Sequence, residues 1–222
     1  MLNCLRLQRV LRGVKRSQGS PAARRLPITD SLLLVIHRAL DLNIFYHCSF
    51  WAACMLGYFG FLRAAEFTVP NLASFSPASD LSVADIAVDL LQSPACLRVW
   101  IIASKTDPFR QGCHIHIGLG RAPLCAVQAL LAYLSLRGNV PGPLFLLANG
   151  QPLSHLILTD WLRQIFSTVG EGNFPSHSFR IGATMVAARN GIPDHQIQDL
   201  GCWTSNAYQL FEALAGISCQ LA

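Results

Sequence analysis

The chain has 222 residues, of which 52% are hydrophobic and 13% are charged, so it is too apolar to remain disordered and long enough for one domain with a short appendage. Of its 17 Lys and Arg residues, seven precede the first acid, Asp30, which leaves 10 basic and 12 acidic residues for the rest. The net charge of +5 therefore belongs to the start of the chain, and any anion site in the acidic remainder must be built from a few placed cations.

The first 25 residues form a basic arm. Residues 10–25 indicate the end of a helix followed by a Ser, Gly, Pro and Ala linker, and a domain is predicted to begin near Leu26. The start carries no secretory signal pattern, although its Arg-rich, acid-free composition also fits a mitochondrial transit peptide as an alternative. Thr29 or Asp30 can cap a first helix over 31–40.

An uncharged apolar run covers residues 42–62 and has the length of a membrane span. It contains Asn43, His47 and Ser49, however, and continues directly into Arg63 and Glu66. We therefore predict a buried core helix over 50–67 and no membrane contact, with a membrane helix as the alternative.

The pattern beyond this run predicts a small sheet followed by helices. A loop is expected over 70–82, and short β-branched segments predict an antiparallel three-stranded sheet over 86–88, 97–103 and 114–117. Helical periodicity then returns at 124–137, 154–169, 178–190, 193–200 and 204–214. The predicted fold class is mainly helical α+β. The eight cysteines lack zinc-ligand spacing, so we expect reduced thiols and no metal.

Four sequence pieces carry candidate chemistry. Arg63 and Glu66 are three residues apart on a predicted helix, where they share a face and can form an ion pair. Lys105 lies at a hairpin tip, where most lysines are simply solvated. His177 and Arg180 share a face at a helix N-terminus, whose donors and positive potential suit a phosphate. The fourth piece is a glycine turn with Trp203 and a short helix that carries Tyr208. Taken singly, each also fits an ordinary structural role.

In this order, the four pieces resemble the catalytic domain of the tyrosine recombinases (the phage-integrase family), and most nearly its eukaryotic Crypton and DIRS-like mobile-element branch. The resemblance covers residues 26–211 and is most specific over 177–203. It implies a recombinase-like catalytic domain over 26–214 and a diverged tail over 215–222. Residues 1–25 would be the remnant of the last helix and linker of a core-binding domain, and the loss of that domain would weaken DNA affinity.

The resemblance also implies a role for each residue on double-stranded DNA, without a cofactor. Arg63 and Arg180 would clamp a phosphate, with Glu66 as the partner that orients them. His177 would move protons, Trp203 would donate its indole N–H, and Lys105 would protonate the leaving 5′-oxygen. The basic arm would add phosphate contacts through Arg9, Arg12, Lys15, Arg16, Arg24 and Arg25.

One departure from the family concerns the nucleophile. The family's tyrosine lies eight or nine residues after the tryptophan, where this chain has Phe211 and Glu212. Phenylalanine lacks the hydroxyl that forms a phosphotyrosine. Tyr208 lies three positions earlier, about 4.5 Å back along a helix axis. It either substitutes for the missing nucleophile or is an ordinary packing residue.

These observations lead to one expectation and one alternative. We expect a nuclear DNA-binding domain of recombinase type that serves DNA recombination or integration, is truncated and lacks strand cleavage. A homo-oligomer could form through its C-terminal segment. The alternative is a non-enzymatic helical interaction module that keeps the fold without DNA activity.

Overall fold

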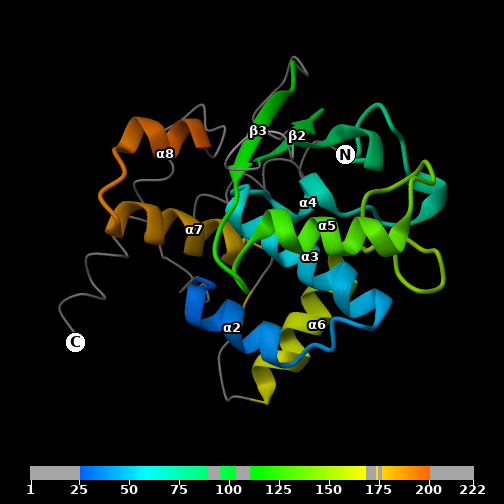
Figure 1. The fold of residues 1–222 in the computed structure, drawn as a ribbon, viewed down its shortest axis with the longest axis horizontal. Coiled ribbons are helices and arrows are strands. Elements are labelled where there is room, and N and C mark those ends of the chain that lie inside the picture. Colours follow the sequence, from blue (N-terminus) through cyan, green and yellow to red (C-terminus); the bar gives the residue numbers. More distant parts are fainter. Residues whose placement is uncertain (1–25, 90–95, 104–110, 169–173, 175–176, 201–222) are drawn as a thin grey trace, which may run out of the picture.

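The computed structural model describes residues 26–89, 96–103, 111–168, 174 and 177–200. Helix α3 (Phe45–Phe59) lies at the centre, with α5 (Ala126–Arg137) and α7 (Ser178–Arg189) packed against it (Figure 1). The sheet lies on one side of α3 in this view, and α2 and α6 lie on the other. The remaining elements are α2 (Asp30–Arg38), α4 (Ala64–Phe67), η1 (Leu72–Ser74), η2 (Val83–Asp85), β1 (Ile86–Asp89), β2 (Cys96–Ile101), β3 (Cys113–Gly118), α6 (His155–Ser167) and α8 (Asp194–Leu200).

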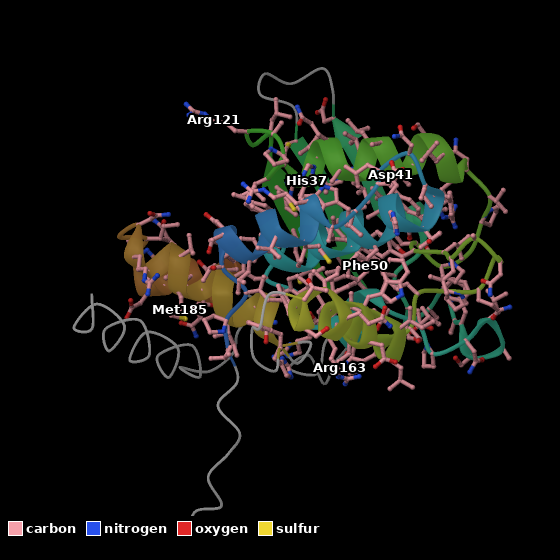
Figure 2. The ribbon with its side chains drawn as sticks, turned by 90° about the horizontal axis from the view of Figure 1, so that it is seen from below. His37, Asp41, Phe50, Arg121, Arg163 and Met185 are labelled. Carbon is pink, nitrogen blue, oxygen red and sulfur yellow. The ribbon has the colours of Figure 1, made fainter. Side chains whose placement is uncertain are left out.

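Helix α3 accounts for most of the apolar run in the sequence. Eleven of its 15 residues are buried, among them Phe50, which is labelled in Figure 2. The Phe50 ring packs against Trp161 of α6 with ring centroids 4.7 Å apart. The prediction of a buried core helix is therefore confirmed. Within the described ranges, no helix is both long and apolar enough to cross a bilayer.

The prediction of one continuous helix over 50–67 was wrong. Helix α3 ends at Phe59, where the Leu62 N–H donates to the Gly57 carbonyl at 3.0 Å and the Phe61 N–H donates to the Tyr58 carbonyl at 3.1 Å. This Schellman closure requires a left-handed residue, and Phe61 supplies it with φ 52°. A left-handed residue with a Cβ costs about 1–2 kcal/mol, which the burial of the Phe61 side chain offsets. Arg63 is consequently the N-cap residue of α4 and not the end of α3.

The sheet confirms the predicted strands to within a few residues. Its order is β1-β2-β3, and both pairs are antiparallel. Alternate side chains of β2 and β3 enter the core, namely Leu97, Val99, Ile101, Ile115 and Ile117. On the opposite face, which we call the open face, the described side chains Arg98, His114 and His116 are exposed. The mainly helical α+β class is therefore confirmed, and Cys48, Cys54, Cys96 and Cys125 are free thiols.

The predicted helices map onto the structure with small shifts at their ends. The helix predicted over 31–40 is α2, with Thr29 as its N-cap residue. Helices α5, α6, α7 and α8 correspond to the four segments predicted between 124 and 200. The helix predicted over 204–214 lies outside the described residues.

Candidate functional site

The predicted pair of Arg63 and Glu66 forms at the start of α4. The Arg63 Nη1 donates to Glu66 Oε1 at 2.8 Å, and the Arg63 backbone N–H donates to Glu66 Oε2 at 2.7 Å. The Glu66 carboxylate thus accepts from both the side chain and the main chain of the same residue. The Schellman turn at Phe61 changes the direction of the chain just before Arg63. The two hydrogen bonds to Glu66 then fix the direction of the Arg63 guanidinium.

Arg180 reaches the same carboxylate from α7. Its Nη1 lies 3.9 Å from Glu66 Oε2, a distance at which charge attraction matters more than a hydrogen bond. The side chains of Arg63, Glu66 and Arg180 are 15%, 7% and 5% exposed. Water therefore screens this cluster weakly. Two guanidinium groups and one carboxylate carry a formal charge of +1, which suits an anion as a further partner.

Close backbone packing sets the position of α7. The Ile28 N–H donates to the Ser178 carbonyl at 2.9 Å. At Gly182 the backbone of Ile28 crosses the helix so closely that a Cβ would lie 1.7 Å from the Ile28 carbonyl oxygen. The chain segment before α2 therefore lies directly against the helix that carries Arg180.

His177 lies at the same end of α7 as Arg180. It is the N-cap residue, its side chain is half-buried, and its carbonyl accepts from the Ile181 N–H at 3.0 Å. The structure therefore brings together Arg63, Glu66 and Arg180, with His177 one helical turn from Arg180. The other predicted site residues lie outside the described ranges: Lys105, Trp203, Tyr208, Phe211 and the arm residues Arg9, Arg12, Lys15, Arg16, Arg24 and Arg25.

Tyr58, five positions before Arg63 in the chain, forms a hydrogen bond with Asp30 that the sequence did not predict. The Tyr58 hydroxyl donates to Asp30 Oδ1 at 2.6 Å, which ties α2 to the last turn of α3. Burial, and then the bond to Asp30, raise the pKa of Tyr58 well above the ordinary 10.0. The two residues are 28 positions apart, so no local spacing could have indicated the contact.

Replacing Tyr58 with phenylalanine should lower the free energy of unfolding by about 1.5–3 kcal/mol, because a hydrogen bond to a charged acceptor is lost. Since the native Tyr58 keeps its proton while the unfolded chain releases it near pH 10.0, native stability falls as pH rises above that value. Tyr58→Phe should remove this part of the alkaline fall. Urea unfolding at neutral pH and above pH 10 measures both effects, and an unchanged midpoint at neutral pH would contradict the first.

The residues described contain no group of three or more His, Cys, Asp or Glu side chains placed to hold a metal ion.

Neither protein-family models nor curated proteins match the sequence. Solved structures do match. The chain is similar to XerA recombinase, with a TM-score of 0.61 and 17% identity over 90% of this chain and 64% of that one.

It is also similar to a lambda integrase dimer bound to a COC′ core site, with a TM-score of 0.57 and 17% identity. A third match is the pre-cleavage complex of XerH site-specific recombinase bound to difH substrate, with a TM-score of 0.58 and 16% identity. The alignments cover 86% and 85% of this chain and 49% and 51% of those chains, so it spans about half their length. These neighbours are tyrosine recombinases. The chain has the fold of the integrase catalytic domain.

Proposed function

We propose that this chain is a DNA-binding domain of tyrosine-recombinase type, from a Crypton or DIRS-like mobile element, that holds one phosphate of double-stranded DNA between Arg63 and Arg180. The observation that carries the proposal is the convergence of both guanidinium groups on Glu66, at 2.8 Å and 3.9 Å, from elements far apart in the chain. The integrase fold and the DNA-bound neighbours support it. Such a protein would act in the nucleus.

The chemistry of the cluster follows from its charges. Each guanidinium presents planar N–H donors that can bind two phosphate oxygens at once, while Glu66 holds Arg63 in place through two hydrogen bonds. The N-terminus of α7 adds backbone donors and positive potential beside Arg180. Trp203 and Lys105 would add donors to the phosphate and to the leaving 5′-oxygen, and His177 would move protons. A preorganised set of this kind stabilises the negative charge of a phosphoryl transition state.

Strand cleavage would need a tyrosine hydroxyl at this site, and the sequence has four tyrosines. Tyr58 is 3% exposed and bonded to Asp30, while Tyr133 is fully buried and donates to the Leu144 carbonyl. Tyr46 packs against Trp161, toward the other end of α3 from Arg63. Tyr208 is the remaining candidate. Because Phe211 occupies the position of the family's nucleophile, we propose that the domain binds DNA without cutting it.

Duplex binding tests the first part of this proposal. In a gel shift, wild-type protein should bind duplex DNA with an affinity that falls steeply with salt, because each neutralised phosphate contributes about 0.9 to the slope of log K against log salt. Arg180→Gln should weaken binding, and its folded state should be checked by thermal melting. Absence of binding at any salt would favour a non-enzymatic interaction module instead.

A nicked suicide duplex tests the second part. Wild-type protein should give no covalent adduct on a denaturing gel, whereas Phe211→Tyr should restore one if the remaining machinery is intact. A wild-type adduct that disappears in Tyr208→Phe would overturn the proposal of inactivity, because it would make Tyr208 the nucleophile. Tyr58→Phe is the matched control, since the Tyr58 hydroxyl is buried and already donates to Asp30.

Analytical ultracentrifugation with and without residues 215–222 would test the proposed C-terminal oligomer contact.

A further inference from the structure

The open face of the sheet carries a group of side chains that the proposed phosphate site does not use. Residues of β2 and β3 alternate between the core and this face, which presents Arg98, Trp100, His114 and His116. Arg98 and both histidines are exposed, and Trp100 is half-buried. We call these four residues the open-face group.

The register places the four side chains next to one another. Arg98 lies directly opposite His116, and Trp100 lies directly opposite His114. The Trp100 and His114 rings have centroids 4.5 Å apart, and the rings of His114 and His116 are 6.3 Å apart. Gly112 fits beneath Trp100, since a Cβ there would lie 2.5 Å from the indole ring. The indole is therefore held between the His114 ring and the backbone.

The chemistry of this group favours an anion. Arg98 forms no hydrogen bond or ion pair within the described part of the chain, so its donors face solvent. Each imidazole has at least one N–H donor whether neutral or protonated. Paired histidines can also bind a metal, but the Arg98 cation opposite His116 repels one and attracts a phosphate. Asp89, on β1, lies on the same face but opposite Cys96, two residue pairs from Arg98.

Covalent geometry places this group near the proposed site. Ile101 and Cys113 form the last residue pair between β2 and β3, and Lys105 lies in the sequence that connects these two strands. Lys105 lies four positions after Ile101 in the chain, and a segment of that length spans at most about 14 Å. Duplex DNA advances about 3.4 Å per base pair. If Lys105 acts on the phosphate held by Arg63 and Arg180, its side chain adds about 6 Å to this span, so the Trp100 end of the sheet lies within about six base pairs of that phosphate.

We infer that the open-face group is a second DNA contact, which binds backbone phosphates that flank the one held by Arg63 and Arg180. The inference rests on the proposed function, because it takes duplex DNA as the ligand. Arg98 supplies the charge, His114 and His116 supply ring N–H donors, and Trp100 packs against the His114 ring and holds it in position. A contact of this kind raises affinity without reading sequence.

Charge substitutions on the full chain test the inference. Binding of a labelled duplex is measured over a range of salt concentrations for wild type, Arg98→Gln and Arg98→Gln/His114→Gln/His116→Gln. Loss of one phosphate contact should lower the slope of log K against log salt by about 0.9 for Arg98→Gln, with a larger loss of affinity for the triple variant. Arg98→Lys keeps the charge and should retain most of the slope. DNA should also change the tryptophan emission of wild type, and this change should shrink in Trp100→Phe.

The matched control is Arg163→Gln, because Arg163 is an exposed arginine on α6 that points away from the body of the protein (Figure 2). If wild type binds duplex and the open-face variants behave like Arg163→Gln, the inference is wrong while the proposed function stands. If wild type does not bind duplex at all, both fail. Vesicles that contain anionic lipid serve as a second probe. Loss of vesicle binding with unchanged duplex binding would assign the open face to membranes and overturn the inference.

Discussion

Gly182→Ala is expected to cost at least about 4 kcal/mol of folding free energy, which is at the upper end for a point substitution. The added Cβ would lie 1.7 Å from the Ile28 carbonyl oxygen and 2.6 Å from its carbon. Both atoms belong to the backbone, so no rotamer change can relieve the overlap. Helix α7 or residues 26–29 must shift, which breaks the Ile28–Ser178 hydrogen bond and moves Arg180 away from Glu66.

Two other glycines provide matched controls. A Cβ on Gly57 would lie 3.0 Å from the tip of the Phe67 ring, which can move, so Gly57→Ala should stay within about 1 kcal/mol of wild type. A Cβ on Gly118 would meet nothing within 4 Å, and Gly118→Ala should change stability by about 0.5 kcal/mol at most. Urea unfolding followed by circular dichroism ranks the three variants. A Gly182→Ala midpoint close to that of Gly57→Ala would show that Ile28 does not hold α7 in place.

The periodicity of the sequence predicted most of the secondary structure of the fold. Amphipathic and β-branched patterns depend on local burial, so they located the three strands and the helices α2, α5, α6, α7 and α8 to within a few residues, but not the short helices α4, η1 and η2. The prediction failed at Phe61, because a left-handed phenylalanine is disfavoured locally and is stabilised by the packing of its side chain in the core. A glycine at this position would have signalled the end of α3.

The contacts of the candidate site were likewise predicted only in part. The spacing of three residues predicted the ion pair of Arg63 and Glu66, although the pair joins the N-cap residue of α4 to its third residue rather than two residues of one long helix. Spacing could not predict that Arg180 shares the same carboxylate, and that contact was anticipated only through the resemblance to a known family. The bonds of Tyr58 to Asp30 and of Ile28 to Ser178 were missed, because each joins residues that only tertiary packing brings together.

Glu66→Gln should lower the free energy of unfolding by about 3 kcal/mol, because it removes a negative partner of the buried Arg180 and the half-buried Arg63. The amide can still accept one hydrogen bond from Arg63, but it carries no charge to offset Arg63 and Arg180. Asp160→Asn is the matched control. Asp160 pairs with Arg163 at the same spacing of three residues, but the two side chains are 55% and 66% exposed. Its loss should therefore cost only about 0.5 kcal/mol.

Duplex DNA should then stabilise Glu66→Gln more than it stabilises wild type. A ligand that binds only the native state adds about 2.7 kcal/mol at 100 times its dissociation constant, and a phosphate can neutralise the charge that Glu66 no longer balances. Thermal melting with and without duplex measures this difference, with Asp160→Asn as the variant that should behave like wild type. Equal stability of Glu66→Gln and wild type would mean that Glu66 does not hold the cluster together. A large loss of stability that duplex does not recover would mean that the two arginines serve the fold rather than a phosphate.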